Sequence, residues 1–190
     1  MKTIVTIGRE FGSGGREVGR RLAEELQIAY YDHEIVTEVT KRTELAEAYI
    51  QSLQEKRPFP MFSMTTGRTF LTLPNPVAEQ QMEILQKESE IILEMALKSD
   101  CVIVGHCADY VLREHYPFRV FLYADREYKI ERCRQREKSR NMTDRELSQK
   151  IAQVDKQRSK YYEFLISQKW GKKANYDLCI NTTATNIEKL

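Results

Sequence analysis

At 190 residues the chain has the length of one ordinary domain, which can bury a hydrophobic core without disulfide bonds. Its net charge is only +2 although 31% of the residues are charged, so we expect no nucleic-acid or membrane partner drawn in by an overall positive field. No apolar run approaches the ~20 residues of a membrane span, no signal peptide precedes the first strand, and the four cysteines form no Cys-x-x-Cys pair. We therefore expect a cytoplasmic protein with reduced thiols.

Short apolar runs alternate with segments of helical periodicity along the chain. The predicted strands are residues 3–7, 28–31, 101–104, 119–123 and 178–180. Two helical stripes lie between them: Val18, Leu22 and Leu26 in the first, and Ile84, Ile91 and Met95 with Leu85, Ile92 and Ala96 in the second. This alternation is typical of an α/β protein whose parallel sheet is covered on both faces. A ligand site is then expected at the carboxyl ends of the strands.

A glycine-rich stretch joins the first strand to the first helix. Its glycines can adopt positive φ angles, and the backbone N–H groups of such a loop and of the helix start bind anions. We therefore predict a loop that binds the phosphates of ATP, made of Gly12, Ser13, Gly14, Gly15, Arg16 and Glu17. Set on the P-loop pattern G-x-x-x-x-G-K-[S/T], the chain has Arg16 in place of the lysine and Glu17 in place of the hydroxyl residue. The alternative is a tight strand-to-helix turn followed by a solvated charge pair.

Polar residues follow the other predicted strands as well. Asp32 comes after the second strand, Gly105 and His106 after the third, and Asp125 after the fourth. Residues 57–76, with four prolines and no clear period, predict a mobile insert without regular structure that contributes to the acceptor pocket.

Arginines gather between the fourth strand and the last helix. Arg132, Arg136 and Arg140 are spaced i, i+4 and i+8, so they share one face if the segment is helical. Phosphoryl transfer needs cations around the migrating phosphate, because its negative charge spreads over the equatorial oxygens. The alternative is a solvated basic helix face.

The last long helix is predicted over residues 143–168 and begins with a capping box, from Thr143 to Glu146. Arg158 lies on its apolar stripe, between Val154 and Tyr161. Such an arginine either contacts a bound anion or pairs with Asp155 one turn earlier.

Together these residues resemble the cytidylate kinase-like family of P-loop nucleoside monophosphate kinases over nearly the whole chain. The resemblance rests on residues 7–17 (IGREFGSGGRE), 30–35 (YYDHEI) and 102–110 (VIVGHCADY), and on the tail from Arg158-Ser-Lys-Tyr-Tyr162 through Trp170 to Tyr176-Asp-Leu-Cys-Ile-Asn181. It implies a single P-loop kinase domain over residues 1–190, with five parallel strands in the order 2-3-1-4-5. It also implies a nucleoside-binding insert at about 33–99 and an arginine-bearing lid at about 126–145.

The resemblance also implies roles for individual residues. The loop residues 12–17 would bind the ATP phosphates, and the catalytic residues would be Arg16, Arg132, Arg136 and Arg158. The substrate-binding residues would be Asp32, Gly105, His106, Asp109, Asp155 and Arg158. No aspartate ends the third strand, where the family usually anchors magnesium, and Asp109 is a possible substitute.

We therefore predict ATP- and Mg²⁺-dependent phosphoryl transfer to a nucleoside monophosphate, most simply CMP or dCMP. The expected partner is a small-molecule nucleotide. Two alternatives stay open: a kinase for a different small acceptor, and a nucleotide-binding module that lacks transfer because Arg16 and Glu17 depart from the P-loop pattern.

Overall fold

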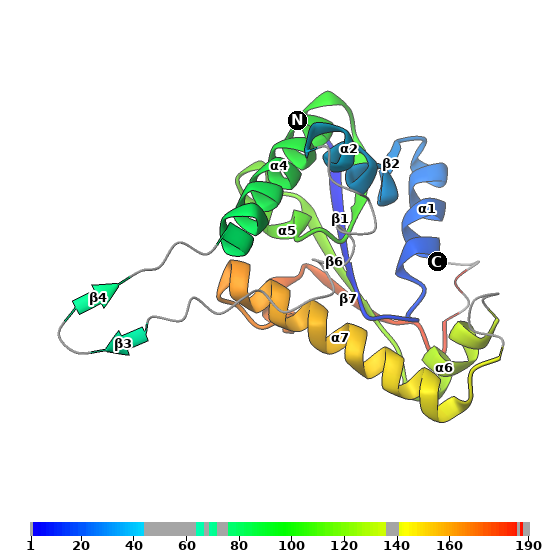
Figure 1. The fold of residues 1–190 in the computed structure, drawn as a ribbon. Coiled ribbons are helices and arrows are strands. Elements are labelled where there is room, and N and C mark those ends of the chain that lie inside the picture. The colour runs from blue at the N-terminus through cyan, green and yellow to red at the C-terminus, as the bar shows by residue number, and fades with distance from the viewer. Residues whose placement is uncertain are drawn as a thin grey trace.

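The protein folds around one five-stranded sheet that is parallel throughout (Figure 1). The computed structural model describes residues 2–43, 64–66, 69–71, 76–135, 141–185 and 187. The strands are β1 Ile4–Arg9, β2 Ala29–Tyr31, β5 Cys101–Val104, β6 Phe118–Tyr123 and β7 Leu178–Asn181. Their order is β2-β5-β1-β6-β7, so the predicted order 2-3-1-4-5 is confirmed. The central strand β1 runs two residues past its predicted end and includes Arg9.

Helices cover both faces of this sheet, and α1 and α4 lie on opposite sides of β1 (Figure 1). The helical segments are α1 Gly15–Leu26, α2 His33–Thr43, α4 Pro76–Lys98, α5 Ala108–Val111, η1 Arg113–His115, α6 Arg126–Arg134, α7 Asp144–Ile166 and η3 Lys173–Asn175. Alternate strand residues face opposite ways. Ile4 and Ile103 pack with α2, α4 and α5, whereas Ile7 and Val104 pack with α1. The predicted α/β class is confirmed.

The first helix meets the sheet through small residues. Gly19 is buried, and a Cβ there would lie 2.6 Å from Cγ2 of Val104, so only glycine lets α1 approach this closely. Val18 and Leu22 pack against the core as predicted, but the prediction for Leu26 is wrong because its side chain is 49% exposed. Leu26 lies seven residues after Gly19 and so on the same side of the helix, but it is the last residue of α1.

The predicted features of the other long helices are confirmed. In α4, Ile84, Ile91, Ile92 and Ala96 are buried. The capping box of α7 is present, since Thr143 accepts from the Glu146 amide and the Glu146 carboxylate accepts from the Thr143 amide.

The structure of the proline-containing segment 57–76 differs from its prediction in one respect. Residues 57–76 were expected to lack regular structure, but β3 Met64–Thr66 and β4 Thr69–Leu71 pair as an antiparallel hairpin. Threonine and phenylalanine favour strands, and this propensity prevails over the composition of the segment as a whole. Its other residues, apart from Pro76 at the start of α4, lie outside the described part, so its contribution to the acceptor pocket stays a prediction.

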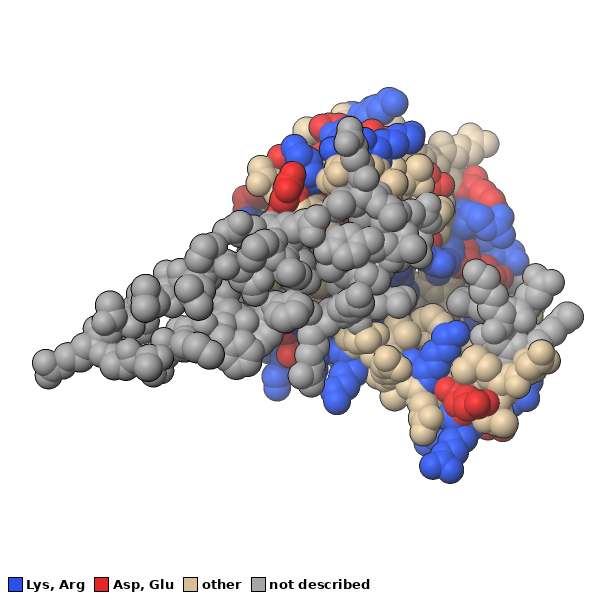
Figure 2. Space-filling view, in the orientation of Figure 1, with Lys and Arg blue, Asp and Glu red and all other residues tan. Residues whose placement is uncertain are grey.

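Charges of both signs mix on the surface. On the face drawn in Figure 2, basic and acidic side chains lie side by side over α2 and α4, where Arg42 pairs with Glu94 at 2.7 Å. Across the described residues, no helix is long and apolar enough to cross a bilayer.

Candidate phosphate-transfer site

A cavity of about 520 Å³ opens at the carboxyl ends of β1, β2 and β5, where ligands bind in parallel sheets. It brings together many of the predicted site residues: Gly12, Gly14, Gly15, Arg16, Asp32, Gly105, His106, Asp109 and Arg158. Four others do not line the cavity: Ser13 and Glu17 belong to the glycine loop and the first turn of α1, Arg132 pairs with Glu17, and Asp155 accepts from the Phe11 amide. Arg136 falls outside the described residues.

The glycine loop has the backbone of an anion-binding loop. Gly12 and Gly14 have φ angles of 86° and 84°, and Gly14 caps the start of α1. Within the described residues, the amides of Gly12, Gly14, Gly15 and Arg16 donate no hydrogen bond. Free N–H groups at a helix start are suited to binding phosphate oxygens.

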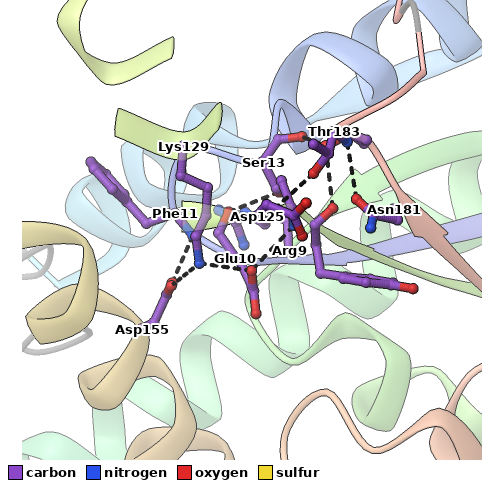
Figure 3. Close-up of polar contacts among 12 residues, drawn as sticks. Arg9, Glu10, Phe11, Ser13, Asp125, Lys129, Asp155, Asn181 and Thr183 are labelled. Carbon is purple, nitrogen blue, oxygen red and sulfur yellow. Dashed lines mark hydrogen bonds and ion pairs between the residues drawn. The ribbon is translucent and has the colours of Figure 1, made fainter. Parts of the chain in front are cut away.

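Side chains of α6 and α7 contact the segment that leads into the glycine loop (Figure 3). The Phe11 amide donates to Asp155 Oδ1 at 2.6 Å, and Lys129 Nζ donates to Glu10 at 2.8 Å and to Asp155 at 3.3 Å. Burial raises the pKa of Asp155, opposed by the Phe11 N–H group and the Lys129 charge. Asp155 thus fastens the loop backbone to α7.

Arg158 lies one turn further along α7 and faces the same loop. Its Nη1 donates to the carbonyl of Arg9 at 3.1 Å, and its guanidinium carbon is 5.7 Å from the centroid of the Phe11 ring. Arg158 therefore contacts the backbone at the end of β1 and lines the cavity, so it is placed to meet a bound anion as well.

Asp32 lies between two arginines. Its Oδ2 is 2.6 Å from Arg16 Nε and its Oδ1 is 3.5 Å from Arg9 Nη2, while its side chain is only 8% exposed. Arg16, expected in the lysine's place, thus reaches across to the end of β2 and stays 61% exposed.

The acidic residue at the start of α1 is neutralised. Glu17 accepts hydrogen bonds from Arg132 at 2.7 Å and Arg21 at 3.3 Å. These arginines, Arg132 above all, hold the pKa of Glu17 below its usual value. The buried Nε of Arg132 has no partner within the described residues. One predicted lid arginine therefore lies beside the loop.

The turn after β5 carries a buried polar pair. Gly105, His106 and Cys107 all have positive φ, which is strained for the two that bear side chains. His106 Nδ1 lies 2.5 Å from Glu88 Oε1, and His106 Nε2 lies 3.0 Å from the Asp32 carbonyl. Since a carbonyl only accepts, Nε2 carries the hydrogen. His106 therefore links α4 to the backbone of the aspartate at the end of β2.

Asp109, in α5, also lines the cavity. Its carboxylate accepts a hydrogen bond from the Tyr162 hydroxyl at 2.6 Å, and burial raises its pKa. In the described part of the chain, no group of three or more His, Cys, Asp or Glu side chains could hold a metal ion. Magnesium in kinases is bound mainly by substrate phosphates with one or two carboxylates, and single carboxylates of the cavity such as Asp109 suit that mode.

The comparisons with known proteins agree with this geometry. The model of the cytidylate kinase-like family matches residues 4–184. The chain belongs to this family. Family and fold together support a kinase-type phosphotransfer. A comparison with curated proteins found no match.

Solved structures share the fold. An uncharacterized protein from Eubacterium ventriosum is 25% identical, with a TM-score of 0.71 over 99% of this chain and 92% of that one. Shikimate kinase from Bacteroides thetaiotaomicron is 15% identical, with a TM-score of 0.56 over 98% and 93% of the two chains. Shikimate kinase from Acinetobacter baumannii, in complex with shikimate, is 19% identical, with a TM-score of 0.53 over 100% and 88%.

Several residues that line or support the cavity were not predicted from the sequence. Arg9 ends the central strand, and Glu88 interrupts the apolar stripe of α4. Glu10, just before the glycine loop, forms an ion pair with Lys129 of α6. For Arg9 and Glu88 a local signal existed, namely a charged residue in a buried apolar run. Lys129 had no such local signal, because nothing near it in the sequence indicates that α6 packs close to Glu10.

Proposed function

We propose that the protein transfers a phosphoryl group from ATP to a nucleoside monophosphate, with CMP or dCMP as the acceptor. One observation carries the proposal: the glycine amides of the loop, which donate to no other described residue, lie at a cavity that Arg16, Arg158 and Asp32 also line. The choice of a cytidine nucleotide rests on the family to which the chain belongs.

In this proposal the donor phosphates bind the loop. The amides of Gly12, Gly14, Gly15 and Arg16 bind their oxygens, and the positive end of the α1 dipole stabilises their charge. Arg132, the proposed lid arginine, is held beside the loop by Glu17 and would offset the negative charge of that residue there. Asp109 is the carboxylate that would contact a magnesium ion bound with ATP, and such an ion would offset the charge of the phosphates.

The acceptor would occupy the opposite side of the cavity, near Asp32, Gly105 and His106. Arg158 would bind the phosphate group of the acceptor with two N–H groups of its guanidinium. Phosphate oxygen is itself the nucleophile, so positioning and charge neutralisation suffice and no strong base is needed. Asp155 would act through the loop that it fastens, and its predicted contact with the substrate stays a prediction.

The direct test is acceptor-dependent release of ADP from MgATP. CMP, dCMP, UMP, AMP and GMP are each supplied, and products are identified by mass. We expect CMP or dCMP to raise the rate at least tenfold over the acceptor-free rate, with CDP or dCDP formed and the activity lost in EDTA. ATP binding without ADP release for any acceptor would contradict the proposal and favour the nucleotide-binding module.

A second candidate is transfer to a small acceptor that bears a hydroxyl group. The observation that favours it is Asp32, a nearly buried carboxylate that lines the cavity and can accept a hydrogen bond from such a nucleophile. ADP release stimulated by sugars or hydroxy acids, and not by nucleotides, would establish this alternative. Asp32→Asn should then reduce the rate strongly, whereas a phosphate nucleophile needs no base.

A further inference from the structure

Arg9 is a cation at the base of the cavity that no prediction above assigns. It ends the central strand β1, directly before the glycine loop, and its side chain is only 15% exposed. The cavity lining includes it together with Gly15 and Gly105. A strand-end position aims its side chain at the space where α/β proteins bind ligands.

Two glycines make room for this side chain. A Cβ on Gly15 would lie 2.5 Å from the Arg9 Cβ and 2.7 Å from its Cγ. A Cβ on Gly105 would lie 1.6 Å from Arg9 Nη1. A side chain at either position would meet Arg9 in its present position, so the absence of a Cβ at Gly15 leaves space for the stem of Arg9 and its absence at Gly105 leaves space for the guanidinium.

The charge of this guanidinium is poorly balanced. The ion pair of Arg9 with Asp32 is long, at 3.5 Å, whereas the other oxygen of Asp32 is taken by Arg16 at 2.6 Å. One carboxylate therefore faces two guanidiniums. Arg9 has five N–H donors, and within the described residues only this one contact uses any of them.

The electrostatics of Arg9 agree with this picture. Burial lowers the pKa of Arg9, and the neighbouring charge of Asp32 only partly offsets the effect. Buried charges in proteins are normally paired and hydrogen-bonded, so a partly paired guanidinium beside a cavity is suited to an anionic ligand.

We propose that Arg9 binds a phosphate group of the bound nucleotide and supplies the positive charge that a lysine supplies in other P-loops. This inference rests on the proposed function, and it moves that role from Arg16 to Arg9. Arg9 lies between the loop and Asp32, so the phosphate belongs either to the donor or to the acceptor. A planar fork can hold two of its oxygens at once.

The test uses three variants of the full chain. Arg9→Met removes the charge and keeps an unbranched apolar side chain, Arg9→Lys keeps the charge and removes the fork, and Arg20→Met is the matched control. Arg20 lies on the surface of α1, 56% exposed, and pairs with Glu24. Affinities for pyrophosphate, ATP and CMP are measured by calorimetry, and melting temperatures are measured with and without each ligand.

We expect Arg9→Met to weaken binding at least tenfold, Arg9→Lys to recover little, and Arg20→Met to leave affinity within twofold. The ligand-free melting temperature of Arg9→Met should be unchanged or higher, because a buried, poorly paired charge is gone. The rise in melting temperature that phosphate ligands produce should then be reduced. A purely structural Arg9 predicts the opposite: a lower ligand-free melting temperature with ligand affinity retained.

The three ligands distinguish the source of the phosphate. Losses confined to pyrophosphate and ATP assign Arg9 to the donor, a loss confined to CMP assigns it to the acceptor, and losses for all three place it between them. A folded Arg9→Met protein that binds all three within twofold of wild type overturns the inference. So does a wild-type protein that binds none of them. If wild type binds pyrophosphate and ATP, Arg9→Met does not, and no acceptor stimulates ADP release, the inference stands and the proposed function fails.

Discussion

Glu17 and Arg132 join the start of α1 to α6 through a hydrogen-bonded ion pair of 2.7 Å. An acidic side chain at this point would repel a phosphate bound to the loop, and the pair cancels that charge. It also holds the Arg132 guanidinium near the loop, since a Cβ on Gly14 would lie 3.3 Å from Arg132 Cζ. The replacement of the P-loop hydroxyl by Glu17 is therefore matched by a cation from the predicted lid.

A double-mutant cycle measures this relationship. Glu17→Gln and Arg132→Met should show a coupling of about 1 kcal/mol in the free energy of unfolding, the range of a partly exposed, hydrogen-bonded ion pair. Urea denaturation of the four proteins gives the value. Arg126, exposed on the same helix, is the control, and Arg126→Met should be additive with Glu17→Gln. Additivity in the Arg132 cycle as well would mean that the pair contributes nothing to stability.

Removal of Arg158 should impair transfer far more than folding. Arg158→Ala deletes the donor to the Arg9 carbonyl and the proposed grip on the acceptor phosphate. We expect turnover to fall on the order of 100-fold, and the melting temperature by about 2–4 °C, the size expected from roughly 1 kcal/mol.

Arg158→Lys should restore little turnover, since a point charge cannot reproduce the bidentate fork. Arg145→Ala, exposed near the start of the same helix, should match wild type. A large loss of melting temperature with normal turnover per folded molecule would assign Arg158 to a structural role.

Glu88 should be necessary for stability because its partners are buried with it. The side chains of Glu88 and His106 are 7% and 4% exposed, and Tyr161 also donates to Glu88. Glu88→Ala leaves His106 and Tyr161 without this acceptor, and the free energy of unfolding should fall by about 3 kcal/mol in urea. Glu83→Ala, on the exposed face of α4, should change it by less than about 0.5 kcal/mol. Equal free energies of unfolding for Glu88→Ala and Glu83→Ala would show that the contact between Glu88 and His106 does not stabilise the protein.

Asp109 should make stability depend on pH. Burial raises its pKa in the folded protein above the unfolded value, so folding favours the protonated carboxyl. Its contribution to stability is complete below the unfolded pKa and is lost as the pH rises through the folded pKa.

Asp109→Asn keeps an acceptor for Tyr162 and cannot ionise, so its stability advantage over wild type should grow from about pH 4 towards neutrality. Chemical denaturation at a series of pH values tests the trend, with Glu114→Gln as the exposed control. A constant difference across this range would contradict the pKa direction.

The sequence by itself determined the class of fold and the place of the glycine loop. The apolar runs of β5 and β6, the glycines at 12 and 14, and the capping box at Thr143 are local signals, because the backbone conformation that each favours depends on adjacent residues. Hydrophobic periodicity likewise predicted the buried face of α4. It misplaced Leu26, which is the last residue of α1 and is 49% exposed.

Only the tertiary structure decided which charges meet. Arg16 bonds to Asp32, Asp155 bonds to the Phe11 amide, and His106 bonds to Glu88, each across a long stretch of chain. Such pairs depend on distances of a few ångströms between packed elements, and no spacing along the sequence encodes those distances. The same holds for Arg9, whose role rests on space left by Gly15 and Gly105 and on the competition of two arginines for one carboxylate.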